Sequence, residues 1–300
     1  RGNSTYFPDR VVPMLPDVLS GDLCSLHEGV ERACIAVRMV LDADGNKIAH
    51  DFHRGLMTSP ASLHYEEVQD AIDGRPNERT KPLLETVLKP LYAAYAALVA
   101  ARERRQPLDL DLPERRIELD DDGIVRSVNF RMRLDAHRLI EECMVLANVA
   151  AAETLIEKKT PLLFRTHEEP TPEKLDALRE TAAAAGYTLA KGQVLQTAHL
   201  NRLLQQAAGT DDAELINIST LRSMTQAYYG ADQIGHFGLA LRSYAHFTSP
   251  IRRYADLIVH RALITAHGWG KDGLSQHDIV DLEATGAHIS DTERRSMVAE

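Results

Sequence analysis

The sequence has few cysteines, few aromatic residues and no long apolar run. Its three cysteines, Cys24, Cys34 and Cys143, are odd in number and widely spaced. This argues against a disulfide framework or a paired metal-ligand set and predicts reduced, mostly buried thiols. We find no run of 18 apolar residues and no N-terminal signal peptide, so we expect no membrane partner and a cytoplasmic location.

Several motifs that carry chemistry are also missing from the sequence. It contains no HExxH, GxSxG, Walker or dinucleotide-binding pattern, which argues against the zinc-protease, α/β-hydrolase, P-loop and Rossmann classes. The thirteen histidines do not form a compact ligand set. Satisfied or surface histidines are therefore favoured over a zinc site.

The charge balance is acidic, with 34 Lys and Arg against 44 Asp and Glu, a net charge of −10. This argues against a protein that coats nucleic acid without specificity. The stretch 219–270 is different, because it carries five arginines and two aspartates, or 5 − 2 = +3. Either a local anion-binding face or an ordinary fluctuation in surface charge explains this excess.

Aromatic residues are only 5% of the chain, yet many lie close to this basic stretch or near the N-terminus. Aromatic rings beside arginines suit the bases and phosphates of a single-stranded nucleic acid, and core packing is the alternative. Eight of the fifteen tyrosines and phenylalanines belong to this set: Tyr6, Phe7, Tyr228, Tyr229, Phe237, Tyr244, Phe247 and Tyr254.

The segment from Gly235 to His260, GHFGLALRSYAHFTSPIRRYADLIVH, is the most informative part of the sequence. Ser249 and Pro250 are typical of a helix N-cap and first turn, and the apolar spacing beyond them predicts a helix. Arg252 and Arg253 then fall in its first turn, where the macrodipole favours anions. We therefore predict that an anion such as phosphate binds at this helix start.

The remaining pattern predicts an α+β architecture, with hairpins early and helices late. Strands at 34–41 and 47–52 flank an Asp-Gly turn, and a small antiparallel unit covers 108–128. Helices are expected at 62–72, 81–105, 134–159, 171–186, 212–228 and 275–300.

An acidic stretch from Asp109 to Asp122 offers oxygen ligands for a hard cation. The same residues also fit a half-exposed strand followed by a hairpin turn at 120–123, which we favour. The sequence therefore predicts no metal site within the chain.

Three stretches resemble a known family: RGNSTYFPDRVVPMLPDVLSGDLCSL at the start, LIEECMVLAN at 139–148, and HFTSPIRRYADL at 246–257. They are similar to the catalytic (RNB) domain of the ribonuclease R and ribonuclease II family, and to its ribonuclease R branch more than to ribonuclease II. The resemblance implies a mixed or antiparallel sheet surrounded by helices that enclose an RNA channel. Residues 1–300 would be the major part of one such domain.

The resemblance also implies a function. Members of the family hydrolyse single-stranded or 3′-overhang RNA from the 3′ end and release nucleoside 5′-monophosphates. On this sequence, Arg252 matches the arginine that contacts the scissile phosphate, and Tyr6 matches the tyrosine that stacks on the terminal nucleotide. Further RNA-binding matches are Arg253, Leu110, which stands where the family has a phenylalanine, and Glu300.

The family's two Mg²⁺ ions are held by aspartates of a DxxxxxDxDD cluster, which would lie upstream of Arg1. We therefore expect a fragment of a monomeric exoribonuclease that is inactive alone. The alternative is a non-catalytic RNA-binding module that keeps the channel but lacks the metal-binding aspartates.

Overall fold

The computed structural model describes residues 2–112, 115–120, 122–130, 132–191 and 194–300. Its strands are β1 (Thr5–Tyr6), β2 (Val11–Val12), β3 (Glu31–Leu41), β4 (Lys47–Thr58), β5 (Arg115–Leu119), β6 (Val125–Phe130), β7 (Phe164–Thr166) and β8 (Tyr228–Gly230). Its α-helices are α1 (Tyr65–Ile72), α2 (Lys89–Arg105), α3 (Asp135–Glu157), α4 (Pro172–Ala184), α5 (Thr197–Ala207), α6 (Ala213–Ser223), α7 (Tyr254–His267), α8 (Gln276–Val280) and α9 (Leu282–Ala299). The α+β class predicted from the sequence is confirmed.

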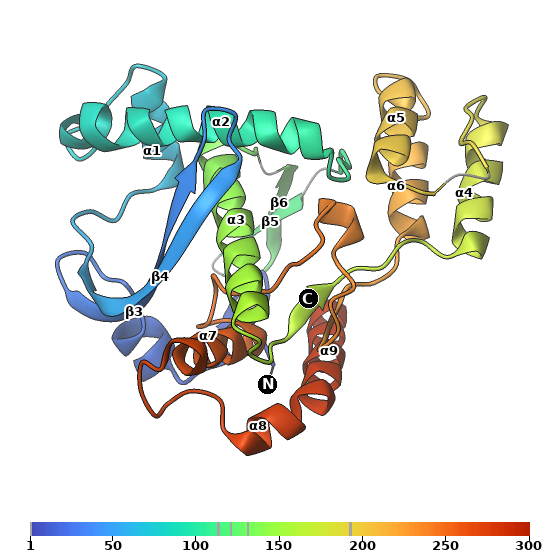
Figure 1. Cartoon of the computed structure of the whole chain (residues 1–300). Helices are drawn as coiled ribbons and strands as arrows, with labels where there is room; N and C mark the ends of the chain where they lie inside the picture. The colour runs from blue at the N-terminus through green and yellow to red at the C-terminus, as the bar shows by residue number, and fades with distance from the viewer. Residues whose placement is uncertain (1, 113–114, 121, 131, 192–193) are drawn as a thin grey trace.

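The strands pair only in twos. The order is β1–β2, β3–β4, β5–β6 and β7–β8, each pair antiparallel. The resemblance implied a mixed or antiparallel sheet surrounded by helices; the strands are antiparallel, but in the described residues they form separate two-stranded units. The helices, not a sheet, join the molecule together, with α3 running through its centre (Figure 1).

The longest hairpin, β3–β4, is the one that the Asp-Gly turn predicted. Asp42 Oδ1 accepts hydrogen bonds from the backbone N–H groups of Asp44 and Asn46, at 3.0 and 2.8 Å. Gly45 has a φ of +78°, and a Cβ there would lie 2.0 Å from the carbonyl oxygen of Ala97. Only glycine fits, because the turn packs directly on α2.

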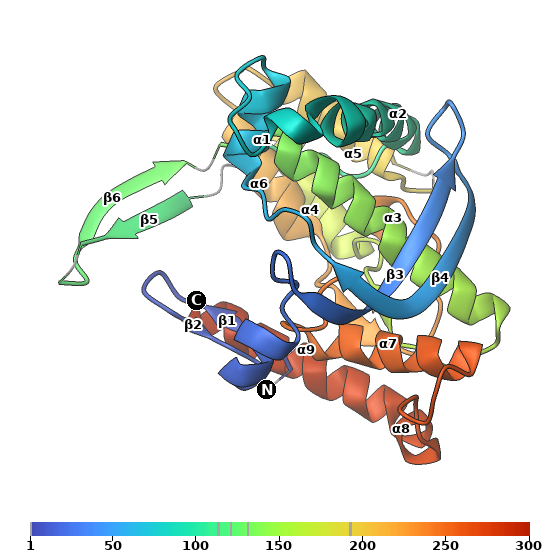
Figure 2. The same ribbon diagram turned by 90° about the vertical axis from the view of Figure 1, so that its left-hand side faces the viewer.

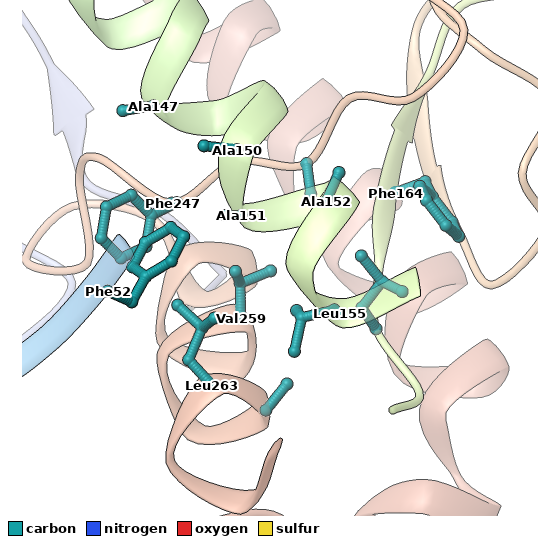
Figure 3. Close-up of a cluster of buried hydrophobic side chains, with 13 residues drawn as sticks. Phe52, Ala147, Ala150, Ala151, Ala152, Leu155, Phe164, Phe247, Val259 and Leu263 are labelled. Carbon is teal, nitrogen blue, oxygen red and sulfur yellow. The ribbon is translucent and has the colours of Figure 1, made fainter. Parts of the chain in front are cut away.

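The main core lies between α3, α7 and the hairpin β3–β4. Small side chains of α3, such as Ala150 and Ala151, are fully buried and let α7 approach closely. Phe52 and Phe247 meet edge to face in this core, with ring centroids 5.3 Å apart (Figure 3). The sequence expectation of a deeply buried helix over 134–159 is confirmed.

A second core belongs to α4, α5 and α6, which stand together at one side of the molecule (Figure 1). Its helix α4 begins as predicted, with the Thr171 hydroxyl accepting from the backbone N–H of Lys174 at 3.4 Å. Leu108 and Leu110 pack against this core. They belong to an extended segment, although a strand was expected there, because Asn201 and Asn217 accept hydrogen bonds from its backbone.

The predicted hairpin around Gly123 is formed by β5 and β6, which project away from the body (Figure 2). Its other expected strand, at 108–112, is the extended segment just described. The predicted helix over 212–228 is shorter than expected, because α6 ends at Ser223 and Tyr228 opens β8. The helix predicted at 275–300 is divided at Asp281 into α8 and α9.

One further expectation needs correction, and another stays a prediction. Cys24 is exposed, and Cys34 and Cys143 are partly exposed, so the thiols are free but not fully buried. The helical stretch Lys81–Arg105 also has the length and composition of a membrane span. One such helix is weak support for a membrane protein, and here its α2 part packs against α3.

Candidate RNA-binding site

The predicted helix start at Ser249 is wrong. Helix α7 begins at Tyr254, and Arg253 is its N-cap. The backbone N–H groups of Arg252 and Arg253 both donate to the carbonyl oxygen of Ser249, at 3.2 and 3.1 Å, so this residue opens a turn. The two arginines therefore lie immediately before α7 and not in its first turn.

The anion expected at this helix start is a side chain of the chain itself. Asp256 is completely buried and accepts from Arg253 at both carboxylate oxygens, Nε to Oδ2 at 2.7 Å and Nη2 to Oδ1 at 2.8 Å. The backbone N–H of Ser249 donates to Asp256 Oδ1 at 2.7 Å. The carboxylate therefore neutralises Arg253 and complements the positive end of α7.

Arg252 is different, because its side chain is exposed and makes no ion pair or hydrogen bond with the residues that the structure describes. Its backbone is nevertheless fixed, since its carbonyl oxygen accepts from the backbone N–H of Ser4 at 2.9 Å. Two residues later, the N–H of Tyr254 donates to the carbonyl oxygen of Gly2 at 2.9 Å. A free guanidinium on a fixed backbone is suited to bind an external anion.

The N-terminal segment that holds this loop also carries Tyr6. The Tyr6 backbone N–H donates to Glu300 Oε1 at 2.9 Å, and the hydroxyls of Thr5 and Ser296 lie 2.8 Å apart. Two of the residues implied by the resemblance, Tyr6 and Glu300, are therefore in contact. Tyr6 is two residues after Ser4, whose backbone N–H binds the carbonyl oxygen of Arg252. The Tyr6 side chain is 47% exposed, so its ring is accessible to a ligand.

A cleft of about 310 Å³ lies beside Arg253. One wall is the face of α3 from His137 to Asn148, a length of about 16 Å at the rise of an α-helix. His246 and Arg253 line the cleft too, and Tyr65 stacks on His137 with ring centroids 4.1 Å apart. The cleft thus combines an arginine with stackable rings, which is the chemistry that single-stranded nucleic acids require.

Asn148 lines the cleft and also binds the segment that leads into residues 249–253, which we call the arginine loop. It is 2% exposed, and its Oδ1 accepts from the backbone N–H groups of Phe247 and Thr248 at 2.9 and 3.3 Å. Its Nδ2 donates to the Tyr244 hydroxyl at 3.0 Å. Two of the stretches that carry the family resemblance, LIEECMVLAN and HFTSPIRRYADL, therefore meet at this one side chain.

Two partly buried histidines near the loop, His236 and His246, are held neutral. Burial, with Arg253 and Arg165 nearby, lowers the pKa of His246 well below its usual value. Burial also lowers the pKa of His236 to about 3, with smaller effects from His167 and Arg165. The hydroxyl of Tyr229 lies 2.9 Å from His246 Nδ1, and since burial raises the tyrosine's pKa, the tyrosine donates and the histidine accepts.

This arrangement predicts loss of stability in mild acid. An unfolded histidine binds a proton near pH 6.5, whereas folded His236 does so only near pH 3. Below pH 6.5 the unfolded state therefore binds more protons, and at pH 5 His236 alone lowers the free energy of unfolding by about 2 kcal/mol. Urea unfolding at pH 7.5 and 5.0 measures this loss. In His236→Gln, the decrease in the free energy of unfolding between pH 7.5 and 5.0 should be smaller by about 2 kcal/mol. An unchanged decrease would contradict the lowered pKa of His236.

Leu110 lies apart from the arginine loop, since it packs against the core of α4–α6. The neighbouring backbone N–H groups are fixed by side-chain oxygens, that of Asp109 by Asn201 at 3.0 Å and that of Asp111 by Asn217 at 2.8 Å. Its role in binding RNA stays a prediction. The role of Arg253 in binding RNA also stays a prediction. Its Nε and Nη2 both donate to Asp256, so Nη1 is the guanidinium nitrogen left outside this pair.

No group of three histidine, cysteine, aspartate or glutamate side chains within the described ranges is arranged to hold a metal ion. The described residues of this chain therefore do not themselves form a site for the two Mg²⁺ ions that the resemblance implies. That the metal ligands lie upstream of Arg1 stays a prediction.

Sequence reasoning missed two residues of this site, Asn148 and Asp256. Each had a signal in the sequence. Asn148 is a polar residue in the apolar part of a helix, where a buried amide needs partners. Asp256 lies three residues after Arg253, a spacing that favours an ion pair once a helix starts at that point.

Comparison with known proteins identifies the family of the chain. The family model described as RNB domain matches residues 1–267. Ribonuclease R of Vibrio parahaemolyticus is 39% identical over 307 aligned residues, which cover 99% of this chain and 37% of that protein. The chain thus spans little more than a third of the length of this curated relative.

Solved structures agree with the sequence comparison. RNase R of Mycoplasma genitalium, in complex with ribose-methylated single-stranded RNA, matches 99% of this chain and 47% of its own, with a TM-score of 0.91 and 28% identity. Yeast Ssd1, described as a pseudonuclease, shares the fold, with a TM-score of 0.75 and 21% identity over 98% of this chain and 36% of its own. From the matched family model and these relatives, the chain belongs to the RNB domain family.

Proposed function

We propose that this chain binds the 3′ end of single-stranded RNA as the major part of a catalytic domain that hydrolyses RNA in the 3′-to-5′ direction. The products are nucleoside 5′-monophosphates. One observation carries the proposal above others: Arg252 presents a free guanidinium on a backbone that Ser4 holds in place. In this position it binds the scissile phosphate and stabilises the charge that develops during hydrolysis.

The surroundings of Arg252 support an RNA ligand. Exposed Tyr6 and the carboxylate of Glu300 meet at the same end of the molecule. The cleft along α3 adds Arg253 and the stacked pair of Tyr65 and His137. The Mycoplasma genitalium relative binds a ribose-methylated single-stranded RNA in its solved complex, and a similar ligand fits the arginines and rings of this chain.

Hydrolysis also needs an activated water. We propose that divalent metal ions, Mg²⁺ in the cell, supply it when held by aspartates outside this chain. The residues of this chain bind and orient the RNA. We further propose a monomer that acts in the cytoplasm without a membrane partner.

The test uses the full-length gene product with Mg²⁺ and a 3′-overhang RNA labelled at its 5′ end. We expect stepwise shortening and nucleoside 5′-monophosphates, separated by chromatography. Binding of the RNA without any shortening would instead favour the alternative, a non-catalytic RNA-binding module. The pseudonuclease Ssd1 shares this fold, so the fold alone does not distinguish the two functions.

Tyr6→Ala is expected to lengthen the final oligonucleotide product by at least one nucleotide. The exposed ring is proposed to stack on the terminal base, and stacking holds short products in place until they are cleaved. The product length is read on a sequencing gel. Phe7→Ala is the matched control, since Phe7 lies beside Arg10, and an unchanged product in Tyr6→Ala would contradict the stacking role.

A further inference from the structure

The segment before α7 is irregular although much of it is buried. Residues 243–252 are neither helix nor strand, and Tyr244, Ala245 and Phe247 are each at most 7% exposed. Backbone groups of such a segment have no regular partners and must be satisfied in other ways. Here several of them are satisfied by polar side chains of α3 and α7, and others by backbone N–H groups such as those of Arg165 and Ser4.

Helix α3 supplies the first fixing point. Asn148 binds the segment at three places, by accepting from the N–H groups of Phe247 and Thr248 and by donating to the Tyr244 hydroxyl. An amide is suited to this because it offers a donor and an acceptor on one short side chain. No other residue type supplies both at the same length without charge.

Helix α7 supplies the second fixing point. Asp256 Oδ1 accepts from the N–H of Ser249 at 2.7 Å. His260 Nε2 lies 2.9 Å from the carbonyl oxygen of Phe247, and its ring stacks on that phenylalanine at 4.6 Å. The backbone is therefore held at three consecutive residues, 247 to 249, directly before the turn that presents Arg252.

We propose that Asn148 is a positioning residue for Arg252. This inference rests on the proposed function, because it assigns to Arg252 the phosphate contact. Asn148 does not touch the phosphate. It fixes the direction from which the guanidinium reaches it, and a shift of about 1 Å in such a group lowers a reaction rate by about 10²-fold.

The experiment is a double-mutant cycle in the full-length gene product with Mg²⁺, measured as the single-turnover rate of RNA hydrolysis. Asn148→Ala alone is expected to lower this rate about 10²-fold. In an Arg252→Ala background the same change should cost less than about 3-fold, because residues that act as a unit are not additive. Independent, multiplicative losses would overturn the proposal.

A conservative variant and a matched control separate positioning from stability. Asn148→Asp keeps an acceptor for both N–H groups and for the Tyr244 hydroxyl, so most of the rate should return. The control is Thr154→Val. Thr154 lies on the same helix as Asn148, and the substitution removes the hydrogen bond of 2.8 Å between the Thr154 hydroxyl and His50, which lies outside the loop. It should leave the rate unchanged, and a loss equal to that of Asn148→Ala would overturn the proposal.

Failure of the proposed function is distinguishable from failure of this inference. If the wild-type protein binds RNA without cleaving it, the hydrolytic function is wrong. The cycle is then carried out on the Kd for the same RNA, where non-additive losses for Asn148→Ala and Arg252→Ala support the positioning role. Additive losses in Kd would overturn it.

Discussion

Arg252→Ala in the full-length gene product is expected to lower the rate of RNA hydrolysis about 10²- to 10³-fold. The affinity for RNA should fall much less, because the charge that Arg252 faces grows in the transition state and only part of it is present in bound RNA. The rate is measured in single turnovers with excess protein and Mg²⁺. The Kd is measured with the metal removed by a chelator.

The matched control is Arg242→Ala. Arg242 is exposed, precedes the same irregular segment and makes no ion pair with the part of the chain that the structure describes. Its loss removes one positive charge without removing the group held at the loop. Equal losses of rate and affinity in Arg252→Ala, or equal losses in the two variants, would contradict a catalytic role for Arg252.

Arg253→Met is expected to lower the free energy of unfolding by about 3–5 kcal/mol. The Arg253 side chain is 15% exposed and its partner Asp256 is 0% exposed. Removal of the guanidinium leaves a buried carboxylate with the Ser249 N–H as its remaining partner. Desolvation of that charge is no longer offset, so the folded state loses stability. Urea unfolding at pH 7 measures the change.

The chain offers a control pair with the same spacing. Asp291 and Arg294 in α9 are also three residues apart, at 2.8 Å, but their side chains are 69% and 46% exposed. Arg294→Met should lower the free energy of unfolding by at most about 1 kcal/mol, because water already screens this pair. Comparable losses in the two variants would show that burial of Asp256 is not what makes its pair important.

Much of the fold is predictable because its determinants are local. The turn of β3–β4 depends on Asp42 and Gly45, which lie within four residues of each other. The start of α4 depends on Thr171 and Pro172 in the same way. Where donor and acceptor are this close in the chain, residue type strongly favours one conformation.

The start of α7 shows where a prediction of helix boundaries from neighbouring residue types fails. Ser249 and Pro250 have the residue types of a helix start, and an isolated peptide would favour one there. In the folded chain Asp256 captures the N–H of Ser249 and the guanidinium of Arg253. These contacts, together with the long-range backbone hydrogen bonds from Ser4 to Arg252 and from Tyr254 to Gly2, override the capping preference, and the helix starts four residues later.

The functional site is predictable only in part, because it joins distant segments. The family resemblance pointed to Arg252 and Tyr6, whereas the partners of Asn148 become visible only in the folded loop that it holds. The β3–β4 and β5–β6 hairpins were predictable from their turns, whereas the pairing of β7 with β8 was not. Hydrophobic alternation shows which residues form a strand, but it does not show which other strands lie beside it.

The contact between Tyr6 and Glu300 has a consequence for folding. It joins residues 294 positions apart. Closing so long a loop is entropically costly, so contacts of this kind form after the local hairpins and helices have reduced the effective length of the chain. We therefore expect the Tyr6 end of the proposed RNA site to form late in folding, when α9 docks on β1.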